Sequence, residues 1–173
     1  MQPGRNFQLL SLILLALPLS ACTIGIRPGT VSVGVGFGVE LSPVITQFRP
    51  DRGEGSYYRV GESVRFVITL NRPGYITLVG VDPDGRAYEF DRFYLNPGTY
   101  TLPLASRQVQ YTLTYPLGLQ QVRAIYTNTP TPGSVRFEGR IYSDGLNSRT
   151  SSYLQLSGAQ VRDVSDTYFY ITQ

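Results

Sequence analysis

The chain has 173 residues and a formal net charge of +3 at pH 7, from 15 basic and 12 acidic side chains. This excess is too small and too evenly spread for a nucleic-acid-binding protein, so we expect no nucleic-acid partner. Every basic residue is arginine, and histidine is absent. These absences exclude Ser-His-Asp and Cys-His catalysis, Schiff-base chemistry on lysine and metal sites built on imidazole.

Residues 1–21 have the pattern of a secretion signal. Arg5 precedes an apolar stretch, residues 7–19, which is shorter than the ~20 residues that a membrane-spanning helix needs. The stretch runs into Leu19-Ser20-Ala21-Cys22, which resembles the lipobox at which bacterial lipoproteins are cut and acylated. The resemblance implies palmitate-type lipidation of Cys22 and a membrane anchor. Thr23 in place of an aspartate implies the outer membrane, on its periplasmic or surface side.

Residues 31–41 alternate strictly between apolar and small or polar side chains, which predicts a β-strand with one nearly bare face. Two interpretations stay open. The strand belongs to the domain's own sheet, or it contacts a partner protein or a second copy through Val35 and Phe37. We assign residues 22–43 to a lipid-anchored tether with this strand, and residues 44–173 to one main domain.

The main domain has the pattern of an all-β protein, an antiparallel β-sandwich of the Ig-like kind. Residues 43–56 are predicted to be a connection, residues 143–145 a turn, and residues 143–157 either a loop or a short helix. Strands are expected at residues 63–70, 75–81, 86–93, 99–104, 109–115, 121–126, 135–141 and 168–171. The first two of these are expected to be antiparallel neighbours, and the second to be central, because it is apolar on both faces.

Five motifs at turns and core positions carry a resemblance to a known family. They are Tyr58-x-x-Gly61-Glu62, Arg72-x-Gly74-Tyr75-Ile76-x-Leu78, Asp82-Pro83-Asp84-Gly85, Gly98-x-Tyr100-x-Leu102-Pro103 and Pro116-x-Gly118. Across about residues 45–130 the chain resembles domain-of-unknown-function family 4384 (DUF4384), a bacterial β-sandwich module of envelope lipoproteins. The resemblance implies a sandwich fold and an assembly in the cell envelope, including envelopes that carry an S-layer.

The densest acidic cluster consists of Asp82, Asp84, Glu89 and Asp91. Such carboxylates suit a calcium loop or a pair of catalytic acids, and they also suit a turn followed by a solvated strand face. The EF-hand pattern fails after its second acid, so we keep these four residues only as candidate metal ligands.

Tyrosine is the other candidate for function, with 13 residues in the chain. Tyr111 and Tyr115 are predicted to share one strand face, as are Tyr168 and Tyr170. Exposed tyrosines stack on sugars or on a partner surface, whereas buried ones fill a core with a hydrogen-bonded hydroxyl. We take these four as candidate binding residues.

The sequence therefore predicts a lipid-anchored envelope protein, located at the outer membrane or S-layer. We expect a structural or assembly subunit that binds envelope proteins or copies of itself, with no catalytic residue and no cofactor beyond the lipid. The alternatives are a metal-dependent oxidative-defence enzyme similar to superoxide dismutase, which the absence of histidine disfavours, and a binder of cell-wall glycan that uses tyrosine and arginine.

Overall fold

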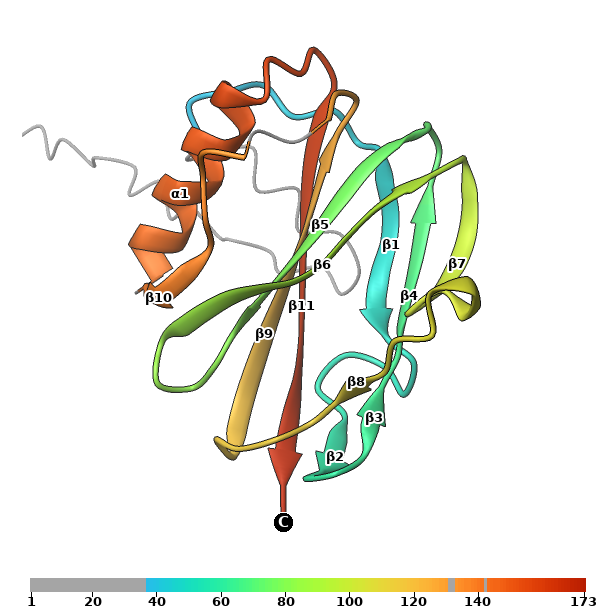
Figure 1. Cartoon of the computed structure of the whole chain (residues 1–173), viewed down its shortest axis with the longest axis vertical. Helices are drawn as coiled ribbons and strands as arrows, with labels where there is room; N and C mark the ends of the chain where they lie inside the picture. The colour runs from blue at the N-terminus through green and yellow to red at the C-terminus, as the bar shows by residue number, and fades with distance from the viewer. Residues whose placement is uncertain (1–36, 131–132, 142) are drawn as a thin grey trace, which may run out of the picture.

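The structure, a computed structural model, describes residues 37–130, 133–141 and 143–173 (Figure 1). Within these residues the strands form a six-stranded sheet, here called the large sheet, a three-stranded sheet, called the small sheet, and a two-stranded pair. The order in the large sheet is β10 (Glu138–Arg140), β6 (Arg86–Leu95), β5 (Gly74–Val81), β9 (Gly118–Thr127), β11 (Arg162–Thr172) and β2 (Tyr57–Arg59). The small sheet is β1 (Ile45–Pro50), β4 (Phe66–Leu70) and β7 (Gly98–Leu102), and the pair is β3 (Ser63–Val64) with β8 (Tyr111–Thr112).

Two hydrophobic cores lie on opposite faces of the large sheet. The small sheet packs on one face, where residues such as Ile68, Leu102 and Ile76 form the first core. Helix α1 (Ser143–Leu156) lies on the other face, here called the outer face, over the second core (Figure 1). The predicted β-rich, sandwich-like arrangement is confirmed at this level, but the described part of the chain also contains this one α-helix.

Strand β5 is central, as its apolar residues on both faces predict. It pairs antiparallel with β6 and with β9, and it contributes side chains to both cores. Its predicted pairing with the preceding strand is wrong, because β4 belongs to the small sheet. The link Arg72-Pro73-Gly74 carries the chain from one sheet to the other, and proline removes a backbone donor that a continued hairpin ladder would use.

The predicted connection at residues 43–56 contains a strand instead. Strand β1 pairs antiparallel with β4, and Ile45 and Phe48 enter the first core. Proline at both ends of this segment suggested a linker, but β1 lies at the edge of the small sheet, where Pro50 at the strand's end is tolerated.

The described part of the predicted strand at residues 31–41 is not a strand. Residues 37–39 form a bend, and Phe37, 1 % exposed, lies in the second core. Val39 and Leu41 pack against the same core. Residues 37–41 therefore follow the hydrophobic surface between α1 and the large sheet, and the predicted tether contributes to the domain's packing.

Residues 143–157, predicted to be either a loop or a short helix, contain helix α1. The helix begins at residue 143, where a turn was predicted. Four of its side chains, Leu146, Thr150, Tyr153 and Leu154, are buried at positions i, i+4, i+7 and i+8, the spacing of one helix face. The hydroxyl groups of Tyr153 and Thr77 lie 2.6 Å apart in a hydrogen bond between the helix and strand β5.

The remaining differences concern strand length and direction. The strand predicted at residues 109–115 is only the short β8, whereas the closing strand β11 extends well before the predicted residues 168–171. β11 pairs antiparallel with β9 but parallel with β2, so the predicted all-antiparallel arrangement is wrong at this edge. The chain reaches β2 from β1 in the other sheet, which frees β2 from the antiparallel direction that a hairpin imposes.

Gly74, one of the motif glycines, occupies a position with no room for a side chain. A Cβ atom there would lie 2.4 Å from the Tyr126 ring and 2.8 Å from the Thr127 carbonyl oxygen. The Tyr126 hydroxyl donates to the Pro73 carbonyl at 2.7 Å, which holds the ring in place.

We expect Gly74→Ala to lower the free energy of unfolding by about 2–3 kcal/mol, measured by urea unfolding. Gly133→Ala, with no atom within 4 Å of its new methyl group, is the control and should cost under about 0.5 kcal/mol.

Candidate functional site

Three tyrosines stand together on the outer face of the large sheet, beyond the part that α1 covers. Phe169 and Ile171 enter the first core, so the alternation along β11 places Tyr168 and Tyr170 on the outer face. Tyr57 of β2 is paired with Tyr170 in the parallel ladder. Figure 1 shows β9 and β11 continuing past the end of α1 toward the C-terminus. We call Tyr57, Tyr168 and Tyr170 the tyrosine row.

The rings of the row touch each other, and two of the three tyrosines are open to solvent. The Tyr57 and Tyr170 rings stack with centroids 5.1 Å apart and an interplanar angle of 19°, and the Tyr168 ring stands at 90° to Tyr170 with centroids 6.1 Å apart. Tyr57 is 65 % exposed and Tyr168 is 38 % exposed. The predicted shared face of Tyr168 and Tyr170 is thus confirmed, and the parallel pairing adds Tyr57, which the sequence had not placed there.

Gly55 supports one end of the row. It has a φ of +74°, which favours glycine, and a Cβ atom there would lie 3.3 Å from the Tyr168 ring. Its backbone N–H donates to the Tyr168 carbonyl at 3.0 Å. The turn before β2 therefore lies directly against the Tyr168 ring.

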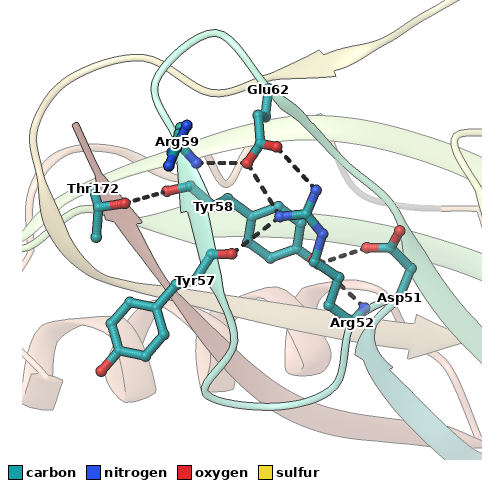
Figure 2. A network of polar contacts seen from close by, with 7 residues as sticks. All are labelled: Asp51, Arg52, Tyr57, Tyr58, Arg59, Glu62 and Thr172. Atoms are coloured by element: carbon teal, nitrogen blue, oxygen red, sulfur yellow. Dashed lines mark hydrogen bonds and ion pairs between the residues drawn. The ribbon is translucent and has the colours of Figure 1, made fainter.

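The outward edge of β2 is occupied by side chains of its own neighbourhood (Figure 2). Arg52 Nη1 donates to the Tyr57 carbonyl at 3.1 Å, and the Arg59 N–H donates to Glu62 Oε2 at 2.7 Å. The Glu62 N–H donates in turn to the Arg59 carbonyl at 3.0 Å. An edge strand normally exposes such groups to any extended chain, so this arrangement protects β2 from strand addition.

A bidentate ion pair holds this edge cap together. Arg52 donates to both carboxylate oxygens of Glu62, at 3.0 and 3.1 Å, and its guanidinium lies 4.3 Å from the centre of the Tyr58 ring. The Tyr58 hydroxyl donates to Asp51 Oδ1 at 2.5 Å. The bond from Arg52, followed by that from the Arg59 N–H, lowers the pKa of Glu62 from its usual 4.5 to about 2.

Tyr111 and Tyr115, the other predicted tyrosine pair, lie in different environments. Tyr111 donates its hydroxyl to Asp91, and burial, followed by this hydrogen bond, raises the pKa of Tyr111. Its ring meets Phe90 edge-on, with centroids 5.1 Å apart. Tyr115 is 65 % exposed but lies outside any strand, between β8 and β9. Tyr111 is therefore a packed, hydrogen-bonded residue, and the two do not form one surface.

The four candidate acids do not converge either. Asp82 pairs with Arg86, Asp84 with Arg140, Glu89 with Arg92, and Asp91 with Arg107 at 2.6 Å. Across the described ranges no three Asp, Glu, Cys or His residues are placed to hold a metal ion. Asp82 and Asp84 belong to the turn between β5 and β6, and Glu89 and Asp91 to strand β6, so ordinary ion pairs explain all four residues.

The remaining candidates lie at the N-terminal end. Cys22 and Val35 fall outside the described residues. Phe37 is described, and its ring is buried beside the Arg123 guanidinium, 5.4 Å from its centre. It therefore contacts its own domain. In the part of the chain that the structure covers, no helix is both long and apolar enough to span a membrane.

Sequence reasoning missed the edge cap of β2. Arg52 and Glu62 stand ten positions apart, and no periodic pattern links them. Their common feature is that they flank the Tyr57-Tyr58 pair, and only the turn at Gly53–Gly55 brings them to the same strand edge. A charged residue on each side of a short strand is the signal that would have suggested this arrangement.

Comparison with known proteins supports the resemblance seen in the turn motifs. Residues 57–130 match the family model described as domain of unknown function (DUF4384). No curated protein matches the chain. The matched segment begins at Tyr57 in the tyrosine row and ends just after β9, so α1 and β11 lie beyond it.

The edge cap makes a prediction about pH. The Glu62 carboxylate has a folded-state pKa of about 2, below its usual 4.5, so its contribution to stability is present above pH 4.5 and is lost as the pH falls toward 2. We expect wild type to melt at a higher temperature than Glu62→Gln at neutral pH and the two melting curves to merge near pH 2. Glu54→Gln, an exposed residue with no ion pair among those described, is the control. Coincident curves for wild type and Glu62→Gln at pH 7 would contradict a stabilising cap.

Proposed function

Residues 57–130 match the DUF4384 family model, and from this premise we propose that the chain is a lipid-anchored subunit of a bacterial cell envelope that works by binding. Its contact surface is the tyrosine row, and its role is structural, joining the membrane to another envelope component. The observation that carries the proposal is the row itself: three adjacent aromatic rings on the outer face of the large sheet, of which Tyr57 and Tyr168 are exposed and Tyr170 is half-buried. Tyrosine is enriched at binding surfaces because it offers a large contact area and little conformational freedom.

The anchor part of the proposal rests on the lipobox resemblance at Leu19–Cys22. Two or three acyl chains on Cys22 hold a protein stably at a bilayer, whereas one chain binds only marginally. The fifteen-residue step from Cys22 to Phe37 reaches at most about 50 Å when fully extended. We propose an outer-membrane location, with the domain working within that distance of the bilayer.

We also propose that the two sheets have Ig-like topology. The small sheet, β1-β4-β7, corresponds to strands A, B and E of that fold, and β6-β5-β9-β11 corresponds to C′, C, F and G. Strand β10 and helix α1 then form an insertion between F and G. This insertion covers one end of the outer face and leaves the other end to the tyrosine row.

The oxidative-defence alternative has no support from the described residues, since each candidate acid is paired with an arginine. The glycan alternative differs, because a row of aromatic rings suits sugars as well as proteins. Purification of the native protein therefore has to detect bound polysaccharide as well as bound protein.

The anchor is tested by the mass of the mature protein. We expect the purified chain to begin at Cys22 and to carry lipid there, and cells labelled with palmitate to incorporate the label into wild type but not into Cys22→Ser. A labelled Cys22→Ser protein, or a mature chain that begins at another residue, would show that the lipobox assignment is wrong.

The contact surface is tested on the native, lipid-anchored protein purified in mild detergent. We expect a larger complex with a companion in fixed proportion, measured by light scattering and composition analysis, and its loss in Tyr57→Ala/Tyr170→Ala. Replacing anchor tyrosines typically costs more than 1 kcal/mol each, so the double variant should bind roughly a hundredfold more weakly. Tyr94→Ala, 50 % exposed at a different strand end, is the matched control.

Either of two results would overturn the binding proposal. The wild-type protein elutes alone, with neither protein nor polysaccharide attached, or the double variant keeps the companion as well as the control does. Circular dichroism melting of each variant separates loss of binding from loss of folding.

A further inference from the structure

We infer that the tyrosine row, together with Arg59, binds an acidic polysaccharide, a chain of sugar rings that carries carboxylates. The inference rests on the proposed function, because it names the chemistry of the envelope component that the row contacts.

A ligand meets side chains here, and not the backbone. The carbonyl of Tyr57 and both backbone groups of Arg59 already have partners in Arg52 and Glu62 (Figure 2). An extended peptide would have to break the Arg52–Glu62 ion pair before it could add to β2 as a strand. The surface therefore selects against the usual backbone-directed mode of protein binding at a sheet edge.

The rings offer both flat surfaces and unused hydroxyl groups. Within the described residues, the hydroxyls of Tyr57, Tyr168 and Tyr170 have no hydrogen-bond partner, whereas those of packed tyrosines such as Tyr58 and Tyr126 do. Sugar rings present apolar C–H faces that pack on aromatic rings, and hydroxyl groups at their rims that pair with phenols. Tyr57 and Tyr170 stack on each other and Tyr168 stands at right angles to Tyr170, so the parts of the row left to a sugar are the uncovered faces and the rims of Tyr57 and Tyr168.

Arg59 places a positive charge beside the row, and its guanidinium forms no ion pair among the described residues. Tyr57 and Arg59 flank the buried Tyr58, so both leave β2 on the outer side, and Arg59 is exposed. Of the acids close to the row along the chain, Glu62 is paired with Arg52 and Asp166 with the buried Arg123 at 2.7 Å, whereas Glu54, in the turn before β2, has no ion pair among the described residues. A guanidinium with a free fork suits a carboxylate, which it binds with two parallel hydrogen bonds.

The test measures binding of the full-length protein in mild detergent to immobilised polygalacturonate, a polymer of carboxylated sugars. Two comparison polymers separate the contributions: a neutral glucan, which has rings without charge, and polyglutamate, which has carboxylates without rings. We expect polygalacturonate to bind at least roughly tenfold more tightly than either.

Single variants assign the contacts. Tyr170→Ala and Arg59→Gln should each weaken binding to polygalacturonate by roughly tenfold or more, since each removes one anchor. Tyr94→Ala and Arg72→Gln, an exposed tyrosine and an exposed arginine on other parts of the surface, are the controls and should bind as wild type does. Arg59→Lys should restore only part of the affinity, because lysine keeps the charge and loses the fork.

The outcomes distinguish this inference from the proposed function. Equal binding to polyglutamate and polygalacturonate means charge attraction alone and overturns the inference, as does equal binding to the neutral glucan. No polygalacturonate binding, together with a protein companion that is lost in Tyr57→Ala/Tyr170→Ala, overturns the inference and leaves the proposed function standing. A row-dependent second copy of the chain would have the same meaning. If the native protein carries no companion and binds no polymer, both are wrong.

Discussion

The guanidinium of Arg123 joins four parts of the chain, and the arrangement of the outer face depends on it. It forms two 2.7 Å bonds to Asp166 of β11 and one 3.0 Å bond each to Asn147 and Thr150 of α1. The Phe37 ring packs against it. A buried arginine is costly unless its donors are satisfied, so β9, β11, α1 and the incoming chain have to meet at this point. Tyr168 of the tyrosine row follows Asp166 by two residues on β11, so the row lies next to this contact.

A second buried carboxylate, Asp163, lies where the chain crosses from one face of the large sheet to the other. Phe37, Val39 and Leu41 pack on the second core, whereas Val44 and Ile45 belong to the first. The backbone N–H groups of Val44 and Ile45 both donate to Asp163 Oδ2, at 2.7 and 2.8 Å. Burial raises the pKa of Asp163, although these N–H groups and that of Val164 act in the opposite direction. The start of the small sheet is thus tied to the first residues of β11.

Much of the fold was predictable, because strands reveal themselves through a period of two and turns through proline and glycine. Residues 75–81 predicted β5 and its central place, and the alternation at residues 168–171 predicted the shared face of Tyr168 and Tyr170. What local pattern could not supply was the assignment of strands to sheets, because a link such as Arg72–Gly74 has the composition of a hairpin turn. Strand β1 was missed for a related reason: prolines at a sheet edge look like those of a linker.

The candidate site shows the same division between local and long-range information. Tyr57 joins the row only through a parallel pairing between residues more than a hundred positions apart. The hydrogen-bond partner of its hydroxyl distinguishes a tyrosine packed into the domain from one in the row. Tyr111 and Tyr58 have carboxylate partners, whereas the row has none among the described residues. No count of tyrosines along the sequence contains that distinction.

The direction of β11 has a mechanical consequence. In the proposed anchored chain, tension from the membrane would pass from Phe37 to the start of β11 through the Ser42–Arg162 hydrogen bond and through Asp163. A ligand on the tyrosine row would pull at the opposite end of the same strand. Because both points of attachment lie on β11, the load would run along the covalent backbone of that strand, while its ladder with β9, from Arg162 to Ile171, keeps the strand in the sheet.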